Sequence, residues 1–308
     1  MTDGQGITMF SNAFKVLEEL GFDTHRAASV PATGWRLYES RDVVKDIEMD
    51  FSAGHSGQPR MQMRSDFREE LLCLTMAPSA DLGLDGQPAK VVIEKAVVDV
   101  GPDEGTVSFA DGSKESADLI IISDRVHSRL CSHILNNDSY QANKIDLTFY
   151  RVALSADKAR EAFRSCLPHF WDPAYPLRGY EYINLSVVFP SRDLGNSNAE
   201  SWRSDGDHDE MVSLVADKVK MWHLRDMDPL PRWNQGRAIL IGDVAYPMTP
   251  LQGQGANMVI EAEVFCLTDP TTSRDEIPEL LQKIDSVRLP HEAAVLNGTR
   301  TLGKDIFS

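Results

Sequence analysis

The residues best placed for chemistry lie between Gly242 and Asn257, where a short apolar run gives way to a glycine-rich segment. The apolar, β-branched run over residues 238–241 predicts a buried strand that ends at Gly242. Asp243 stands at the strand end, where its carboxylate could accept hydrogen bonds from a hydroxylated ligand. The apolar positions from Ala256 onward predict a helix. Because the first turn of a helix has free backbone N–H groups, this corner could hold an anion or a polar ring edge.

Glycines in the connecting loop favour close approach of a ligand. Gly253 and Gly255 lack a Cβ, so another group could come near their backbone. The same residues also fit an ordinary strand–loop–helix corner with a Gly-Asp turn, and their spacing alone does not decide between these two interpretations.

The whole segment resembles a known motif. Residues 242–257 read Gly-Asp-x-Ala-x-Pro-x-x-Pro-x-x-Gly-Gln-Gly-Ala-Asn, which is similar to the second FAD motif of the aromatic-hydroxylase type of flavoprotein monooxygenase, the group that includes salicylate and 4-hydroxybenzoate hydroxylases. The resemblance implies that Asp243 contacts the ribityl chain of FAD and that the helix start faces the pyrimidine end of the flavin. The residues implied at the helix start are Pro250, Gly253, Gln254, Gly255, Ala256 and Asn257. Tyr246 replaces a histidine that is common in the family, and we treat it as a substrate candidate.

Two further segments resemble this family. Residues 61–72 are similar to its Arg-x-Asp-Leu segment, which implies that Arg64 reaches over FAD. The residues alone favour a simpler interpretation, in which Ser65 or Asp66 caps a helix start and Arg64 lies in water. The predicted strand over residues 118–122 leads to Asp124, where the family has Gly-Ala-Asp-Gly-x-x-Ser, so Asp124 is a further cofactor candidate.

Arg125 departs from that pattern, because the family has glycine at this position. If the turn needs a positive φ or close backbone approach, arginine either strains it or blocks the cofactor groove. Alternatively, the arginine adds a cation that offsets lost phosphate contacts.

The first FAD motif of the family is missing from the sequence. No strand, Gly-x-Gly-x-x-Gly turn, helix and second strand precede residue 12, so we expect an N-terminally truncated member that opens without a strand. Residues 12–21 predict an amphipathic helix with Phe14, Leu17 and Leu20 on one face and Gly21 at its end. Loss of a phosphate-binding turn predicts weak or absent FAD binding.

The remaining pattern predicts a mixed α/β fold. Residues 90–93, 96–100 and 105–109, with an Asp111-Gly112 turn, predict a β-meander, and residues 34–60 predict loops and a hairpin. Residues 147–153 and 180–189 predict strands, and the resemblance implies that they belong to the family's substrate sheet, in which Tyr175 and Arg178 are substrate candidates. Residues 275–288 predict a closing helix that is followed by Pro290.

The resemblance implies two domains. We expect an incomplete Rossmann-like FAD-binding domain over residues 1–145 and 234–308, without its first βαβ unit. A mainly β-sheet substrate domain, residues 146–233, is expected as an insertion.

Composition limits the partners. The chain has 308 residues and a formal net charge of −16, which argues against nucleic acid as a partner. No run of roughly 18 apolar residues predicts a membrane span, and the first residues lack signal-peptide features, so we expect a cytoplasmic protein. The four cysteines and eight histidines show no ligand spacing, so no metal is expected. A sheet edge left exposed by the missing unit would invite a homodimer.

Three functions are consistent with these features. The resemblance implies an FAD-dependent monooxygenase that uses NADH or NADPH to hydroxylate an aromatic or polyketide-like small molecule, and in such an enzyme no side chain must act as a nucleophile. The catalytic residues are therefore unknown. The missing first motif and Arg125 instead favour a flavin-independent isomerase, cyclase or small-molecule-binding protein. The shortenings also allow an incomplete gene product without function.

Overall fold

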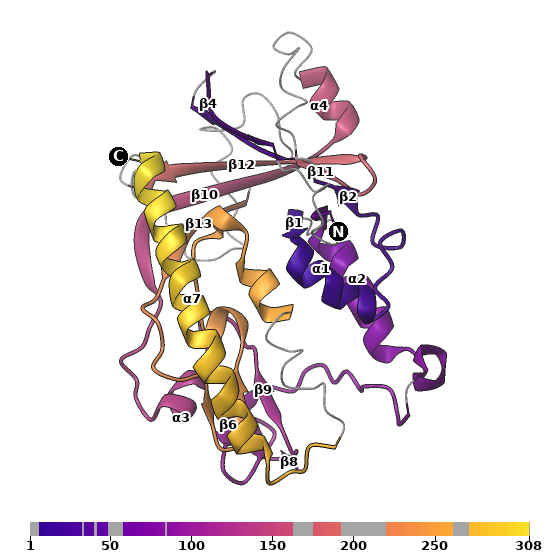
Figure 1. The fold of residues 1–308 in the computed structure, drawn as a ribbon, viewed down its shortest axis with the longest axis vertical. Helices are drawn as coiled ribbons and strands as arrows, with labels where there is room; N and C mark the ends of the chain where they lie inside the picture. The colour runs from indigo at the N-terminus through magenta and orange to yellow at the C-terminus, as the bar shows by residue number, and fades with distance from the viewer. Residues whose placement is uncertain are drawn as a thin grey trace. The chain divides into compact units, whose positions relative to one another are not determined.

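The structure, a computed structural model, describes residues 6–32, 34–39, 42–48, 58–83, 85–162, 175–191, 220–260 and 271–307 (Figure 1). The chain forms two compact units. Unit 1 comprises Met1–Lys90 and Asp146–Leu224, and unit 2 comprises Val91–Ile145 and Arg225–Ser308. The mixture of helices and sheets confirms the predicted fold class.

Unit 1 begins with a strand, so the expectation that the chain opens without one is wrong. Strand β1 (Gly6–Met9) pairs antiparallel with β5 (Arg60–Met63), which also pairs with β2 (Val30–Pro31). Four residues carry little local strand signal, and β1 is stabilised by a partner that lies about fifty residues away in sequence.

Helix α1 (Ser11–Glu19) follows β1 and was predicted. Phe14 and Leu17 are buried, and Gly21 has a φ of +87°, as a glycine at a helix end should. The prediction for Leu20 is wrong, because this C-cap side chain is 62% exposed.

Helix α2 (Arg64–Met76) continues directly from β5. Its N-cap is Met63 and no side chain caps it, so the prediction of a Ser65 or Asp66 cap is wrong. Phe67 packs on Phe22 with ring centroids 5.5 Å apart. A single-turn helix, η1 (Ser79–Leu82), follows. The predicted hairpin is also present, as β3 (Gly34–Glu39) and β4 (Asp42–Glu48).

A four-stranded sheet has the order β11-β12-β10-β13 (Figure 1). The predicted strands are confirmed as β10 (Asn143–Ser155) and β12 (Tyr182–Pro190), which pair antiparallel over nine residue pairs. The edges are β11 (Tyr175–Leu177) and β13 (Lys220–Asp226), and helix α4 (Ala156–Ala162) follows β10.

Unit 2 contains the predicted meander, formed by β6 (Val97–Gly101), β7 (Thr106–Phe109) and β8 (Lys114–Ser116). Residues 90–93 form no strand, and Ile93 is 77% exposed, so that part of the prediction is wrong. A second small sheet has the order β14-β15-β9, formed by Asn234–Gln235, Ala238–Leu240 and Ile120–Ile122. Ala238, Ile239 and Leu240 are fully buried, as predicted for that strand. Short helix α3 (Cys131–Leu135) packs on β14 and β15.

Helix α7 (Ile277–Phe307) closes unit 2 and continues through Pro290, whereas the sequence predicts its end before that residue (Figure 1). Proline in a helix interior costs about 3 kcal/mol. The helix nevertheless continues, because Ile284, Leu281 and Leu296 are buried along it and oppose this cost. The Asn234 side chain donates to the Leu281 carbonyl oxygen at 2.9 Å, which joins α7 to β14.

Candidate functional site

Two parallel strands of unit 2 bring the predicted acids to one edge of a sheet. β9 and β15 pair in parallel, with Ile122 opposite Leu240. The Ile241 N–H donates to the Ile122 carbonyl oxygen at 3.0 Å just beyond the strands. Because the carboxyl ends of parallel strands meet at the same edge, Asp124 and Asp243 both follow that edge, and both are exposed.

A sharp turn places Asp243. Gly242 has a φ of +73°, and a Cβ built there would come within 3.3 Å of Val259 Cγ2. The positive φ favours glycine here, and the contact leaves little room for a side chain. The turn continues as η3 (Gly242–Val244), whose Gly242 carbonyl oxygen accepts from the Ala245 N–H at 2.8 Å. Asp243 therefore lies in a turn that a backbone hydrogen bond holds in place.

The predicted helix start follows a second single turn, η4 (Pro250–Gln252). Gly253 ends this turn with a φ of +66°, and its N–H donates to the Pro250 carbonyl oxygen at 3.0 Å. Residues 255–260 are helical. Asn257 is fully buried, and its Nδ2 donates to the Gly253 carbonyl oxygen at 2.9 Å, so this side chain closes the turn.

The backbone at the helix start is accessible. Gln254 and Ala256 are partly exposed, and the Gln254 carbonyl oxygen accepts from the Met258 N–H at 2.9 Å. Among the described residues, a Cβ built on Gly255 would meet no atom within 4 Å. A ligand could therefore come close to this backbone, whose first N–H groups and helix dipole favour an acceptor.

Arg125 occupies a left-handed turn beside Asp124. Its φ is +76°, in the region that favours glycine, which is the residue the family has at this position. The Ser128 N–H donates to the Arg125 carbonyl oxygen at 3.0 Å, which fixes the turn, and the side chain is exposed. Arg125 therefore strains the turn, and such strain is common at functional sites.

A buried thiol stands near the same edge. Burial raises the pKa of Cys131 to about 11, and the negative charge of Asp124 adds to this rise. The thiol therefore stays protonated at neutral pH, which argues against a nucleophilic role.

Tyr246 lies in the core of unit 2. Its side chain is 2% exposed, and its ring packs against Trp233 with centroids 4.9 Å apart. The structure therefore gives this substrate candidate a packing contact, and its role in substrate binding stays a prediction.

The three other predicted residues lie in unit 1. Arg64 is exposed at the first residue of α2, Tyr175 begins β11, and Arg178 stands in the turn between β11 and β12. They thus belong to a different compact unit from Asp124 and Asp243.

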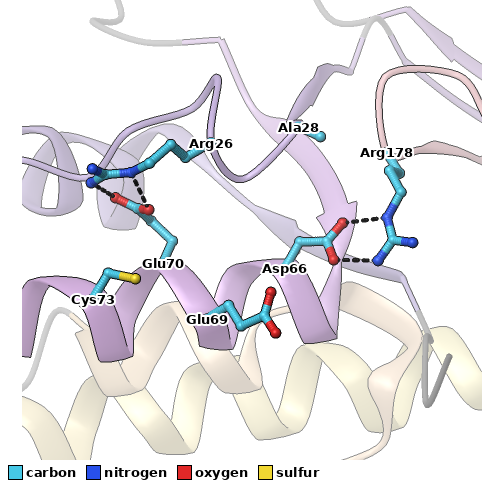
Figure 2. A pocket seen from close by; sticks show the side chains of 7 residues that line it. All are labelled: Arg26, Ala28, Asp66, Glu69, Glu70, Cys73 and Arg178. Carbon is cyan, nitrogen blue, oxygen red and sulfur yellow. Dashed lines mark hydrogen bonds and ion pairs between the residues drawn. The ribbon is translucent and has the colours of Figure 1, made fainter. Parts of the chain in front are cut away.

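Arg178 forms a two-pronged ion pair with Asp66. Its Nε donates to Asp66 Oδ2 at 2.8 Å and its Nη2 to Asp66 Oδ1 at 2.5 Å, which raises the pKa of Arg178 (Figure 2). The backbone of Arg178 is left-handed, with a φ of +46°, and the next N–H, of Gly179, donates to the Ala28 carbonyl oxygen. The spacing of Asp66 and Arg178, 112 positions apart, gave no signal for this pair.

An open pocket of about 470 Å³ lies between this pair and a second one (Figure 2). Arg26 Nε donates to Glu70 Oε2 at 2.8 Å, and Arg26 Nη2 donates to Glu70 Oε1 at 2.6 Å. The pocket is lined by Arg26, Ala28, Asp66, Glu69, Glu70, Cys73 and Arg178. Of these residues, the sequence predicts only Arg178 as a ligand contact.

The described parts of the chain show neither a cluster of metal-binding side chains nor a membrane-spanning helix. These residues contain no group of three or more histidine, cysteine or acidic residues arranged to hold a metal ion. None of the helices described is both long enough and apolar enough to cross a membrane.

The sequence of this chain is similar to those of known monooxygenases. No family model matches the chain. It is 26% identical to 3-amino-4-hydroxybenzoate 2-monooxygenase PtmB3 of Streptomyces platensis, over 98% of this chain and 78% of that protein. It is 28% identical to the FAD-dependent monooxygenase phomE′ of Diaporthe leptostromiformis, over 92% of this chain and 79% of that protein.

A solved structure has the same fold. A salicylate hydroxylase substrate complex superposes with a TM-score of 0.76 and 24% identity, over 97% of this chain and 80% of that one. The chain therefore has the mixed helix and sheet fold of this hydroxylase.

Proposed function

We propose that this chain, whose homologues are FAD-dependent monooxygenases, is an FAD-dependent monooxygenase that hydroxylates an aromatic small molecule with NAD(P)H as electron donor. The observation that carries the proposal is the edge where β9 and β15 end. There an exposed acid follows each of two parallel strands, and a helix begins at an open glycine soon afterwards.

The residues at this edge fit the sugar-alcohol chain and ring edge of a flavin. Asp243 is an exposed acceptor for the ribityl hydroxyls, and Asp124 offers a second one. The backbone N–H groups of the first helical turn suit the acceptor atoms of the pyrimidine end of the flavin. Open space at Gly255 leaves room for close approach of the ring.

Each residue then has a proposed task. Asp243 and Asp124 bind and orient the cofactor, Pro250 and Gly253 shape the loop, and Arg64 covers the cofactor. FAD supplies the redox chemistry when bound, by activating oxygen for transfer of one atom to an electron-rich ring. The protein contributes orientation and exclusion of water. No side chain has to act as a nucleophile, because the cofactor carries the chemistry.

The substrate is proposed to be an aromatic or polyketide-like small molecule. The relatives act on 3-amino-4-hydroxybenzoate and, for the solved structure, salicylate, by their names. We propose Tyr175, Arg178 and Tyr246 as substrate contacts. Of these, Arg178 carries a charge suited to a carboxylate, although it would have to share its guanidinium with Asp66.

The homologues favour the monooxygenase over a flavin-independent isomerase or cyclase and over a product without function.

The expected division into a cofactor domain (1–145 and 234–308) and a substrate domain (146–233) is retained as a proposal, as is a cytoplasmic location. The net charge of −16 supports the proposal that nucleic acid is not a partner. A homodimer is proposed because β9 lies at the edge of its sheet among the strands described, with Ile121 40% exposed.

Flavin titration tests the function. We expect added FAD to bind saturably, to shift its visible absorbance, and to support NAD(P)H oxidation that hydroxylates a member of a panel of aromatic acids and phenols. Free FAD with the same donor and substrates is the control. A folded protein that ignores millimolar FAD would overturn the proposal.

A further inference from the structure

A buried acid lies on α7, away from the strand ends described above. Glu292 is 1% exposed, and its Oε2 has no hydrogen-bond partner among the residues described. Asp226 Oδ1, in β13, is also buried without such a partner. A buried carboxylate without donors is destabilising, so the charge state of Glu292 should matter to its surroundings.

The face of α7 that carries Glu292 holds the segment over residues 249–258. Arg288, Glu292, Leu296 and Thr299 are spaced by four, four and three residues and are all buried, so they share one face. Arg288 Nη2 donates to the Met258 carbonyl oxygen at 3.1 Å. Thr299 Oγ1 lies 2.9 Å from Thr249 Oγ1 and donates to the Thr249 carbonyl oxygen at 3.2 Å.

A third contact lies at the middle of that segment. A Cβ built on Gly298 would come within 2.9 Å of Gln252 Nε2, so α7 packs tightly there. The acid thus stands between the contacts of α7 with the two ends of residues 249–258, the segment that contains the proposed flavin-facing helix start.

Two described charges act on Glu292, one from its own helix and one from β13. Arg300 is engaged elsewhere, since its Nε donates to Asp226 Oδ2 at 2.6 Å and its Nη2 to Asp228 Oδ1 at 3.0 Å. Arg288 is closer to Glu292 along α7, and its Nη1 lies 3.1 Å from His291 Nδ1. Burial raises the pKa of Glu292 to about 7, Arg300 opposes this rise, and Asp226 adds to it.

The sign of the effect follows from these values. The pKa in the folded chain is above the ordinary value of 4.5, so the folded state binds more protons between pH 4.5 and about 7. Stability is therefore greater at the acidic end of this window and falls as the pH rises through it.

We propose that Glu292 is a positioning residue whose neutral form keeps α7 packed on residues 249–258, and whose ionisation loosens this segment. Since the segment is the proposed flavin contact, the inference that pH tunes FAD affinity rests on the proposed function. The loosening itself does not.

Amide hydrogen exchange measures the loosening without cofactor. For peptides covering residues 249–258, protection corrected for intrinsic exchange should fall about threefold to tenfold between pH 6 and pH 8 in the natural chain. Glu292→Gln, which keeps a neutral side chain of the same shape, should abolish this fall. Glu279→Gln, at an exposed position on the same helix whose side chain is 74% exposed, should behave as the natural chain.

Equal pH dependence in Glu292→Gln and the natural chain would overturn the proposal, as would protection that does not change with pH in either. Flavin titration at the same pH values separates the two claims. If FAD binds normally but the exchange protection of residues 249–258 does not depend on Glu292, only the role of Glu292 is contradicted. If the protection depends on Glu292 as expected but FAD does not bind, only the proposed function is contradicted.

Discussion

The hydrogen bond from the Ile241 N–H to the Ile122 carbonyl oxygen, 3.0 Å long, aligns two parallel strands so that an acid stands two residues beyond each end of the bond. Those acids, Asp243 and Asp124, come from segments more than one hundred residues apart. Their common edge is a consequence of the parallel pairing of β9 with β15. Binding sites at the carboxyl ends of parallel strands arise in this way.

Replacing Asp243 by alanine should weaken FAD binding without unfolding the protein. A hydrogen bond to a charged group contributes about 1.5–3 kcal/mol, so we expect the Kd for FAD to rise about tenfold to a hundredfold. The side chain is exposed, so Tm should change by less than about 1 °C. Fluorescence titration with FAD and a thermal melt measure the two quantities.

Asp138→Ala is the matched control for this variant, because Asp138 is another exposed acid of unit 2. It should leave the Kd unchanged. If both variants lost affinity equally, the effect of Asp243→Ala would come from the change in net charge and not from a contact with FAD.

Replacing Arg125 by glycine should stabilise the chain. A residue with a Cβ destabilises the folded state by about 1–2 kcal/mol in the left-handed region, where Arg125 lies. Glycine removes this cost, but its greater conformational entropy in the unfolded chain cancels part of the gain. We expect a net gain of about 0.5–1 kcal/mol, seen as a rise in Tm of about 1–3 °C. Arg125→Ala keeps the strain and is the control, so a melt in which alanine stabilises as much as glycine would argue against strain at this φ.

Local patterns predicted the elements whose signal lies in adjacent residues. The run of buried β-branched residues gave β15, and Asp111-Gly112 gave the turn between β7 and β8, where Gly112 has a φ of +84°. The motif also marked Arg125 as a position where the family has glycine, and the structure gives it a φ of +76°. In each case the physical constraint is local, so a short window contains it.

A short window of sequence does not predict pairing between residues that are far apart in the chain. Strand β1 exists because β5 hydrogen-bonds to it, and α7 passes Pro290 because residues on both sides of it are buried. The ion pair of Asp66 with Arg178 and the burial of Glu292 likewise depend on tertiary packing. The motif named Asp243 as a site residue, but only the sheet register brings Asp124 to the same edge.

Asp66 and Arg178 should prove energetically coupled. Their side chains are 11% and 30% exposed, and both prongs of the pair are short. We expect a double-mutant cycle of Asp66→Ala and Arg178→Ala to give a coupling free energy of about 1–2 kcal/mol, above the range of an exposed pair. Chemical unfolding of the four proteins measures it. Strictly additive losses would mean that the pair contributes nothing to stability.

Glu70 should make unit 1 sensitive to acid. Its carboxylate is buried, and the hydrogen bonds from Arg26 hold its pKa below the ordinary 4.5. Because the folded pKa is lowered, this contribution is complete above about pH 4.5 and is lost as the pH falls further. Glu70→Gln should therefore destabilise the chain at pH 7 by about 1–2 kcal/mol, a value kept modest because Arg26 is largely exposed.

The difference between this variant and the natural chain should shrink below pH 4, as urea unfolding at several pH values will show. Glu69→Gln, one position earlier on α2 and exposed, is the control and should show no such dependence. A constant difference between Glu70→Gln and the natural chain from pH 3 to pH 7 would show that Glu70 stabilises unit 1 by packing rather than through its charge.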